Sequence, residues 1–339
     1  MKRHGNLWEK IIDIENIRIA YNNAKRNKKH LRGVRRFEMD VEDGLLKIQN
    51  MLLNKTFRTS PYHKKLAYYP KFREIWVVPF FPDRVVQHAL MRVVEPIWDK
   101  LLSSNTMSCR KGKGVELAAT KTYEYVKRNK YCLKCDISKF YPSINHDIMY
   151  KLVQHKIKCK DTLWLLKDII YSFGGETNSP IGNYTSKWFG NLYLDTIDKW
   201  ATQVWKVDYV RYCDDFIFFS DDKTKLNQIA KLLPDKLLKE RKLKLSKLDL
   251  FPTTRGIDFI GYRFFNQGYI LLRKRIAKVL RRRLIRIANK LESGILTRRI
   301  QGQVAAAIGL LRRCNSYNFK KSVNLSKIIE LTGIKTKYK

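Results

Sequence analysis

The stretch DYVRYCDDFIFFSDD, residues 208–222, places two adjacent acids between two apolar runs. Both runs are rich in aromatic and β-branched residues, so we expect two buried strands joined by a tight turn. Asp214 and Asp215 would repel each other there, and they are costly to bury unless a partner neutralises them. Two interpretations are open at this point: aspartate is a common turn residue, and paired carboxylates also suit a hard cation such as Mg²⁺.

The composition favours a polyanion as partner. The chain has 339 residues, with 69 Lys and Arg against 31 Asp and Glu and a net charge of +38. That excess is larger than solubility requires, and it is typical of nucleic-acid-binding proteins. The chain contains no apolar run of 18 residues, and its N-terminus lacks the apolar core of a signal peptide. We therefore expect a cytoplasmic protein that binds nucleic acid and no membrane.

The cysteines give little support to a metal site of their own. Cys132 and Cys135 form one CxxC pair, but no second pair stands at the spacing of a zinc site. The segment KYCLKCDI also predicts a strand, in which successive side chains alternate between faces. Buried or free thiols are the favoured interpretation and zinc the alternative. The histidines are scattered, and none pairs with Ser or Cys in a pattern typical of hydrolases.

The expected elements mix helices and strands along the chain. Basic helices are expected first, then a proline-punctuated hairpin, a strand near the middle, and further helices on either side of the acidic hairpin. Helices are expected over residues 1–60, 83–102, 145–172, 185–200 and 223–239. The hairpin is expected over 61–82 and the middle strand over 131–137, and KLDLFP and GIDFIGYRFF are further strand candidates. The last 69 residues contain 19 Lys or Arg and two acids, and they show helical periodicity. They predict a separate basic helical module.

A third acid, Asp136, follows the strand segment YCLKC and precedes a turn at Pro142 and Ser143. Taken alone, it is equally well a strand-end cap. Opposite the tip formed by Asp214 and Asp215, it completes what a two-metal phosphoryl-transfer site needs, because carboxylates from different strands must bridge ions about 3.5–4 Å apart. Such ions would also remove the repulsion at the tip. Combined with the basic surface, the three acids favour a polymerase.

Several motifs resemble those of reverse transcriptases, in the same order, over about residues 60–265. RYCDDFIFFS is similar to their Tyr-x-Asp-Asp motif, with Cys213 at the variable position. LKCDISKFYPSI resembles the first palm motif, and SPIGNYTSKWFGNLYL resembles the motif that packs beneath the nascent base pair. REIWVVPFFPDRVVQHAL and SCRKGKGVELAA resemble fingers segments shared with group II intron and other bacterial enzymes, and GIDFIGYRFF resembles the primer grip.

The resemblance implies a right-hand polymerase. This is an α+β fold with fingers, an antiparallel-sheet palm of the RRM type and a helical thumb. We expect fingers with an N-terminal helical extension over residues 1–115, a palm over 116–269 and a basic helical thumb over 270–339. Residues 145–184 would be a fingers insertion within the palm.

The resemblance also implies the ligands of two Mg²⁺ ions, with Mn²⁺ as the alternative ion. Asp136 and Asp214 would hold both ions, Asp215 would assist, and the backbone carbonyl of Ile137 would complete the set. The competing interpretation is a non-catalytic RNA-binding or scaffold protein that retains the polymerase fold, and the presence of all three acids argues against it.

Nucleotide binding would involve residues from two segments. The amides of Lys139 and Phe140 would contact the triphosphate of a dNTP, together with Arg73, whose guanidinium suits phosphate. Tyr141 would crowd the 2′-position of the sugar and exclude ribonucleotides. A solvated hairpin charge is the alternative for Arg73, and core packing is the alternative for Tyr141. Lys64 or Lys65 would assist Arg73 in binding phosphate, and their spacing does not choose between them.

The basic C-terminal module would follow the phosphates of an RNA template and a DNA or RNA primer, and its affinity would depend steeply on salt. The residues expected to do so are Arg273, Lys274, Arg275, Arg281, Arg282 and Arg283.

Among bacterial branches, the resemblance points to the reverse transcriptases of diversity-generating retroelements. PIGN stands where most relatives have Gln-Gly, and RRCNSYNFKK resembles a stretch of their short thumb. Lys187 departs from that family, which usually has Gln after the serine. This subtype implies a bacterial or phage-encoded enzyme that copies a template-repeat RNA, makes errors at template adenines and works with a small basic accessory protein. A retron or phage-defence reverse transcriptase is the alternative.

Ile181 and Gly182 are the residues on which the error-prone character would depend. The glycine would let the backbone approach the nascent base pair. Isoleucine neither donates nor accepts a hydrogen bond, so the pair would be held by shape alone. Ordinary packing is the alternative for Ile181.

Overall fold

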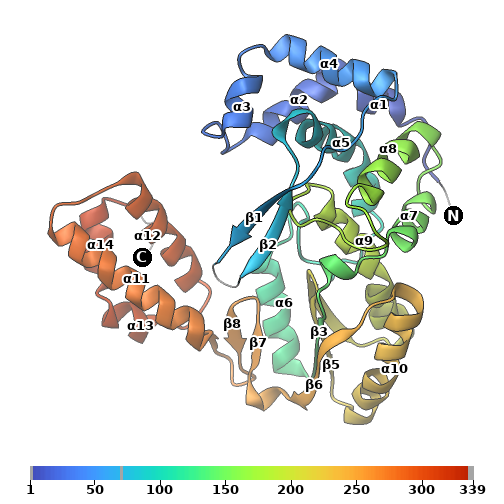
Figure 1. Ribbon diagram of the computed structural model, residues 1–339. Coiled ribbons are helices and arrows are strands. Elements are labelled where there is room, and N and C mark those ends of the chain that lie inside the picture. The colour runs from blue at the N-terminus through green and yellow to red at the C-terminus, as the bar shows by residue number, and fades with distance from the viewer. Residues whose placement is uncertain (1–2, 69–71, 335–339) are drawn as a thin grey trace.

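The computed structural model describes residues 3–68 and 72–334, and Figure 1 shows them as three connected parts. A helical part at the N-terminus lies above a sheet with its covering helices, and a helical bundle at the C-terminus stands to one side. Helices and antiparallel sheets are both present, so the expected α+β class is confirmed.

The N-terminal part consists of short amphipathic helices whose apolar faces share one core. Two of them begin with an aspartate cap, since Asp13 and Asp40 each accept hydrogen bonds from backbone amides of the first turn. A hairpin, a kinked turn in which Phe81 is extended, and a longer helix follow. The elements are α1 (Trp8–Ile12), α2 (Ile14–Lys25), α3 (Arg32–Phe37), α4 (Val41–Leu53), β1 (His63–Ala67), β2 (Arg73–Val77), η1 (Phe80–Arg84) and α5 (Val85–Asp99).

The central part, which we call the palm sheet, is four-stranded with the order β4-β5-β3-β6, and every pairing is antiparallel. Its chain path, strand–helix–strand–strand–helix–strand, is that of the RRM-like fold expected from the sequence. Its strands are β3 (Tyr131–Ile137), β4 (Asp208–Tyr212), β5 (Asp215–Ser220) and β6 (Leu245–Pro252).

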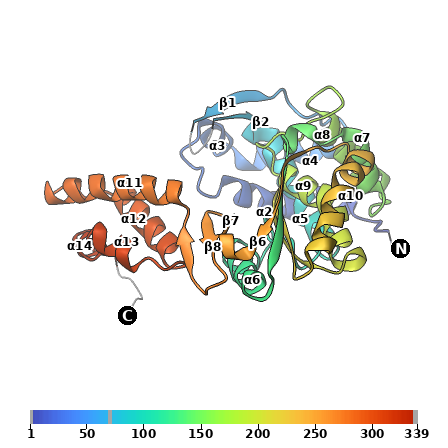
Figure 2. The ribbon, with the colours of Figure 1, turned by 90° about the horizontal axis from the view of Figure 1, so that it is seen from below.

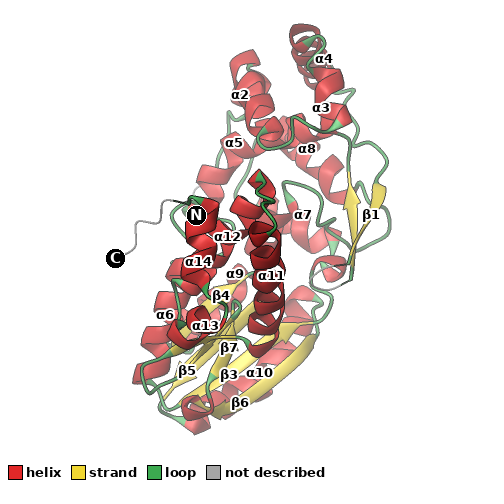
Figure 3. Ribbon diagram, turned by 90° about the vertical axis from the view of Figure 1, so that its left-hand side faces the viewer, coloured by secondary structure: helices red, strands yellow, loops and turns green. Residues whose placement is uncertain are grey.

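Helices cover both faces of the palm sheet. Helix α10 packs on β3, β5 and β6, and α6 contacts β4; Figure 3 shows the strands lying side by side at the bottom of the view. Helices α7 and α8 pack together, and α9 packs on α5. The bounds are α6 (Val115–Arg128), η2 (Tyr141–Ser143), α7 (His146–Gln154), α8 (Lys160–Tyr171), α9 (Ser186–Lys199), η3 (Trp200–Val204) and α10 (Lys223–Arg241).

The alternation of side chains along β3 separates the CxxC pair. Cys132 is buried in the core on the α6 side, whereas Cys135 is buried in the core shared with the N-terminal helices. Side chains on opposite faces of a strand cannot share one ion. The favoured interpretation, buried free thiols, therefore replaces the zinc alternative.

One strand prediction needs correction. GIDFIGYRFF is a tight hairpin, in which β7 (Ile257–Phe259) pairs with β8 (Tyr262–Phe264) in a small sheet completed by β9 (Ile270–Leu272). Ile260 and Gly261 both have positive φ, 42° and 92°, and two such residues in succession are typical of a type I′ turn. The segment is mostly apolar and aromatic on both sides of Gly261, so the sequence pattern did not reveal this turn. A short helix, η4 (Thr253–Arg255), precedes the sheet.

The C-terminal bundle has its own hydrophobic core, to which Leu280, Leu284, Val304 and Ile328 contribute. It is joined to the small sheet by Leu272, which touches both cores. Figure 2 shows the bundle extending away from the rest of the molecule. Its helices are α11 (Lys274–Glu292), α12 (Arg298–Leu311), α13 (Tyr317–Ser322) and α14 (Leu325–Thr332). Among all described helices, none combines the length and apolarity needed to cross a membrane.

Candidate active site

The register of the palm sheet brings the three acids together. Asp136 on β3 lies directly opposite Asp215 on β5. Tyr212 pairs with Asp215, so Cys213 and Asp214 alone form the turn of the β4–β5 hairpin. Cys213 has a φ of 57°, which gives the tight turn its left-handed residue. The pairing of β3 with β6 shifts between Asp136 and Ile137, and such irregularities are common beside functional sites.

The tip of the hairpin is electrostatically unsatisfied. Burial raises the pKa of the Asp214 carboxyl, and the charge of Asp136 raises it further. Burial likewise raises the pKa of Asp215 to about 6, although the ammonium of Lys134 opposes the shift. Lys134 lies 3.4 Å from Asp215 Oδ1, but that oxygen is buried and accepts no hydrogen bond. A buried carboxylate oxygen without a donor fits a cation as its missing partner.

The acids do not form a complete metal site by themselves. Ser246 donates a hydrogen bond of 2.7 Å to Asp136 Oδ2, and the ammonium of Lys134 also donates to the carbonyl of Asp258. Within residues 3–68 and 72–334, no three His, Cys, Asp or Glu side chains are grouped closely enough to hold an ion alone. Mg²⁺ commonly takes one or two carboxylates and completes its shell with water and substrate phosphates. The donor set fits that mode of binding.

Most of the residues expected to bind metal or nucleotide line one cleft of about 930 Å³. It joins β2, the end of β3, the β4–β5 turn and the loop before α9, so segments far apart in the sequence meet there. The expected residues that line it are Arg73, Asp136, Ile137, Lys139, Phe140, Tyr141, Ile181 and Asp214. Asp215, Gly182 and the basic residues of the C-terminal bundle do not line it.

The backbone after β3 is shaped for an anion. Lys139 is left-handed, with a φ of 42°, and Phe140 follows in the right-handed helical region. Successive residues of opposite hand form a concave nest of amides that binds anions. Among the described residues, neither amide donates a hydrogen bond to a protein acceptor. Both amides therefore remain available to a phosphate group.

Tyr141 and Ile181 face the cleft from opposite segments. Tyr141 is half-buried, and burial raises the pKa of its hydroxyl. Gly190 of α9 leaves space for the aromatic pair, because a Cβ there would lie 3.1 Å from the ring of Phe140 and 3.4 Å from that of Tyr141. The side chain of Ile181 is 41% exposed. Ile181 is therefore not a buried core residue, and its contact with the nascent base pair stays a prediction.

The structure shows a packing constraint on Gly182 that the sequence did not reveal. A Cβ on this residue would lie 2.1 Å from the carbonyl oxygen of Trp76 and 2.6 Å from a methyl group of Val77. The glycine is needed because the loop before α9 passes against strand β2. A residue without a side chain therefore lets the β1–β2 hairpin pack on this loop. A contact between Gly182 and a nucleotide stays a prediction.

Three cations of the β1–β2 hairpin were expected at the site. Among the described residues that line the cleft, Arg73 is present, and Lys64 and Lys65 are not. Its positive charge opposes the rise that burial causes in the pKa of Asp214. Lys64 instead forms an ion pair of 2.5 Å with Glu74 and lies over the ring of Trp76, and Lys65 is exposed on β1. The geometry thus separates Arg73 from the two lysines.

The basic residues of the bundle lie at the start and middle of α11, away from the acids. Arg273, Lys274, Arg275, Arg281 and Arg282 are exposed, and Arg283 is half-buried. Arg273 and Arg281 are examples with protein partners. Arg273 pairs with Asp258 at 3.4 Å, and Arg281 donates a hydrogen bond to Ser322.

The sequence interpretation missed a fully buried ion pair beneath the hairpin. Arg211 of β4 donates two hydrogen bonds, of 2.8 and 2.6 Å, to Asp198 of α9. Thr106 donates to the same carboxylate, and the side-chain carbonyl of Asn191 accepts from Arg211. The available signal was an arginine flanked by buried strand residues, since a charge in such a position requires an opposite charge.

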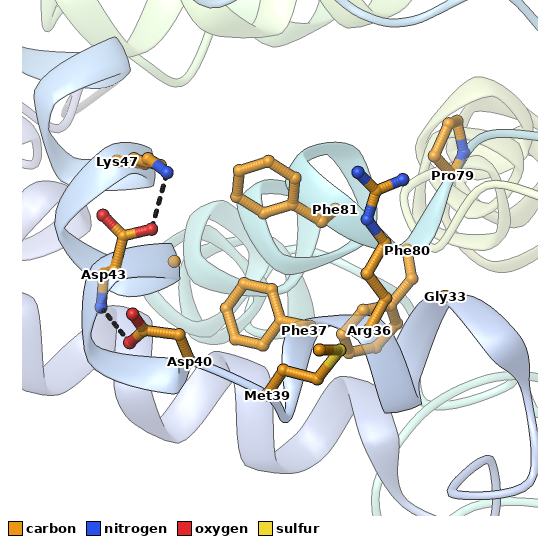
Figure 4. Close-up of a pocket in the computed structure, with 11 residues that line it drawn as sticks. Gly33, Arg36, Phe37, Met39, Asp40, Asp43, Lys47, Pro79, Phe80 and Phe81 are labelled. Carbon is orange, nitrogen blue, oxygen red and sulfur yellow. Dashed lines mark hydrogen bonds and ion pairs between the residues drawn. The ribbon is translucent and has the colours of Figure 1, made fainter.

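A second concavity lies among the N-terminal helices, with a volume of about 600 Å³. Figure 4 shows its aromatic floor, which includes Phe37 and Phe81, and the acids at its edge. Both acids have local partners, because Asp40 caps α4 and Asp43 pairs with Lys47 at 2.6 Å. This pocket lacks unpaired carboxylates, so the cleft at the palm sheet is the candidate active site.

One protein family matches more than half of this chain. A family model described as reverse transcriptase (RNA-dependent DNA polymerase) matches residues 63–264. The protein YkfC of Escherichia coli (strain K12) is 22% identical over 240 residues, covering 56% of this chain and 62% of that protein. The chain thus spans less than two thirds of this curated relative.

Two solved structures share the fold. A telomerase from Candida albicans, in complex with a TWJ fragment of telomeric RNA, is 12% identical with a TM-score of 0.51, covering 84% of this chain and 62% of that one. An apo telomerase from Candida tropicalis is 13% identical with a TM-score of 0.50, covering 82% and 60%. These likenesses confirm the expected right-hand polymerase fold with its antiparallel sheet.

Proposed function

The chain belongs to the reverse transcriptase family, and on that premise we propose that it copies an RNA template into DNA by extending a primer with dNTPs. The observation that carries the proposal is the acidic tip of the β4–β5 hairpin. There Asp136 and Asp215 face each other across two strands, Asp214 sits in the turn, and one buried carboxylate oxygen lacks a donor.

The reaction is nucleotidyl transfer. The 3′-oxygen of the primer attacks the α-phosphorus of the dNTP, an O–P bond forms, and the bond to pyrophosphate breaks. Asp136 and Asp214 would hold divalent ions, with Asp215 and the carbonyl of Ile137 in support. When bound, such ions lower the pKa of the primer hydroxyl and neutralise the leaving pyrophosphate.

The residues of the cleft would orient the dNTP. The amides of Lys139 and Phe140 form a nest for phosphate oxygens, and the guanidinium of Arg73 lies across the same cleft. Tyr141 presents an aromatic ring at the cleft wall. We assign to this ring the exclusion of the 2′-hydroxyl, which selects deoxynucleotides.

We divide the chain into fingers over residues 1–115, a palm over 116–269 and a thumb over 270–339, with 145–184 as a fingers insertion. The separate core of the C-terminal bundle supports the thumb boundary. Fingers and palm share one continuous core, so their boundary rests on the motifs. In the thumb, the exposed basic face of α11 would bind the phosphates of the primer–template.

We further propose that the enzyme is the mutagenic polymerase of a diversity-generating retroelement, bacterial or phage-encoded and cytoplasmic. The exposed, apolar Ile181 at the cleft supports this. Sites that hydrogen-bond a ligand reject wrong partners more strongly than apolar ones, because a mismatch leaves polar groups unpaired. A template-repeat RNA and a small basic accessory protein would be its partners.

Extension of a labelled primer on an RNA template, with Mg²⁺ or Mn²⁺ and dNTPs, tests the activity. We expect metal-dependent extension by the wild type. A protein that binds the primer–template but never extends it would instead be a non-catalytic RNA-binding protein.

Sequencing of the cDNA made by the wild type and by Ile181→Gln tests the subtype. We expect wild-type errors to concentrate opposite template adenines and the variant to reduce them. Wild-type errors spread evenly over all four template bases would favour a retron or phage-defence enzyme.

A further inference from the structure

The β1–β2 hairpin, which carries Arg73, is a projecting arm of the molecule. Its two strands form a separate two-stranded sheet, and Figure 1 shows the hairpin extending downward from the N-terminal helices. A two-stranded hairpin by itself is only marginally stable in water. The position of Arg73 at the cleft therefore depends on how the base of the hairpin is held.

Tyr62, the residue before β1, lies at the centre of a chain of hydrogen bonds. Asn183, in the loop before α9, donates from Nδ2 to the Tyr62 hydroxyl at 2.7 Å. The hydroxyls of Tyr62 and Ser172 are 2.8 Å apart, and Ser172 donates to the carbonyl of Ile169 at 2.8 Å. Because Ser172 caps the end of α8, one tyrosine hydroxyl joins the hairpin, this helix and the loop that contains Ile181.

The direction of each bond in this chain is fixed by its neighbours. A carbonyl can only accept, so Ser172 donates to Ile169, and the Ser172 oxygen accepts the proton of Tyr62. The Tyr62 oxygen is left with lone pairs, which accept from the amide group of Asn183. Asn183 is buried, so loss of the hydroxyl would leave a buried donor without its partner, which is costly.

Two carboxylates hold the chain segment that leads to Tyr62. The amide of Thr59 donates to Asp168 of α8 at 2.9 Å. The amide of Ser60 donates to Asp83 of η1 at 2.8 Å. The entry to β1 is therefore fixed from α8 and η1, and Tyr62 adds the link to the loop before α9.

Aromatic contacts extend this link to the wall of the cleft. The ring of Phe173 meets the rings of Tyr62 and Trp76 edge to face, with centroids 5.3 Å apart in both pairs. Phe173 and Trp76 line the cleft, and the carbonyl of Trp76 lies against Gly182. A displacement of Tyr62 would therefore reach the cleft through packed rings.

We propose that Tyr62 is a positioning residue, whose hydroxyl fixes the β1–β2 hairpin to the loop before α9 and thereby holds Arg73 where it binds the triphosphate of a dNTP. The first half of this statement concerns the hydrogen bonds alone, and the second half rests on the proposed polymerase function. Tyr62 is not among the described residues that line the cleft. It acts through the hairpin and does not touch the nucleotide.

Two variants of the full-length protein interrupt the chain of hydrogen bonds. Tyr62→Phe keeps the ring and removes the hydroxyl, and Ser172→Ala removes the acceptor of its proton. Tyr171→Phe is the matched control, because its hydroxyl donates to Asp147 of α7 at 2.6 Å and takes no part in the chain.

Hydrogen exchange followed by mass spectrometry tests the link without any enzyme activity. In Tyr62→Phe and Ser172→Ala, the amides of residues 59–62 and 179–186 should exchange about fivefold faster, the factor that corresponds to one net hydrogen bond. Tyr171→Phe should match the wild type in both segments. Unchanged exchange in both test variants overturns the link.

Single-nucleotide primer extension tests the effect on Arg73. Tyr62→Phe should raise the KM for dNTP about tenfold with kcat within about twofold of wild type, because the lost contact is made before and during the reaction. Tyr171→Phe should keep the wild-type KM. In an Arg73→Gln background, Tyr62→Phe should change KM by less than about twofold, since a residue that acts through Arg73 then has nothing to position.

A merely structural role of Tyr62 would give a different pattern. It would lower kcat, or it would multiply its effect on KM with that of Arg73→Gln, and either result overturns the positioning role. If the wild type extends no primer, the polymerase proposal fails, and the second half of our statement fails with it. Hydrogen exchange still decides whether the hydroxyl links the hairpin to the loop.

Discussion

The β4–β5 hairpin carries two charged clusters, and the fold treats them in opposite ways. Beneath the hairpin, Arg211 and Asp198 are completely buried, joined by two hydrogen bonds and supported by Thr106 and Asn191. At the tip, Asp214 and Asp215 are half-buried, and the buried atom Asp215 Oδ1 accepts no hydrogen bond. One cluster is closed by protein groups, and the other is left open.

The difference separates structural charge from functional charge. A buried pair with all its hydrogen bonds made is stable but costly to break. A set of carboxylates whose pKa values are raised by burial destabilises the fold unless something outside the chain binds to it. We therefore expect a ligand to stabilise the tip, and we expect the inner pair to hold the tip in position.

The largest effect is expected on activity at the open cluster. Asp136→Asn or Asp214→Asn should reduce primer extension by more than about 100-fold, because the transition state loses a ligand to its stabilising charge. The free energy of unfolding should not fall, since like charges are removed. Asp235→Asn, on the exposed side of α10, is the control. Either variant keeping a tenth of wild-type extension would contradict the assignment.

At the closed cluster, the expected effect is on stability. Arg211→Met leaves Asp198 buried without its partner, which should cost about 3–5 kcal/mol of unfolding free energy in urea titrations. Adding Asp198→Leu should recover part of the loss, because both charges are then gone. The exposed Arg282→Met serves as control. Equal stability of Arg211→Met and Arg282→Met would show that the inner pair does not hold the hairpin.

A smaller effect is expected at the cleft wall beside the open cluster. Tyr141→Ala should admit ribonucleotides, with a loss of discrimination of about 1–3 kcal/mol, or roughly 10–200-fold. Single-nucleotide incorporation with matched ribo- and deoxynucleotides measures this. Tyr141→Phe keeps the ring and should keep the selectivity. If the alanine variant selects deoxynucleotides as well as wild type does, Tyr141 is a packing residue.

The smallest effect is a pH dependence of stability without metal. The folded protein raises the pKa of Asp215 from 3.8 to about 6, so it binds this proton more tightly than the unfolded chain does. The contribution of Asp215 to stability should therefore fall as the pH rises from about 4 to 6. In EDTA, Asp215→Asn should show a shallower decline than wild type. Identical pH profiles of the two proteins would contradict the buried, unsatisfied state of this acid.

Much of the fold was predictable because its signals are local. The alternation in residues 208–220 and the turn between the two strands belong to one short segment, and Asp136 stands at the end of its own apolar run. Part of the cleft was predictable for the same reason, because Lys139 and Tyr141 are close in sequence to Asp136. Helical periodicity likewise predicted the basic bundle.

The remaining features depend on contacts between distant segments. Ser246 reaches Asp136 only because β6 pairs with β3, and Asp198 reaches Arg211 only because α9 packs on β4. Gly182 has the same origin, since its constraint comes from Trp76 of the other hairpin. Strand register and helix packing set these partners, and a single sequence shows neither.

The most direct test of the open cluster is a count of bound ions. Electron paramagnetic resonance would measure Mn²⁺ binding to the protein with an RNA template, a chain-terminated primer and the next dNTP. We predict two bound ions in wild type and in Tyr141→Phe, and a loss of binding in Asp136→Asn and Asp214→Asn. Equal Mn²⁺ binding by wild type and both acid variants would contradict the claim that these carboxylates are left open for metal.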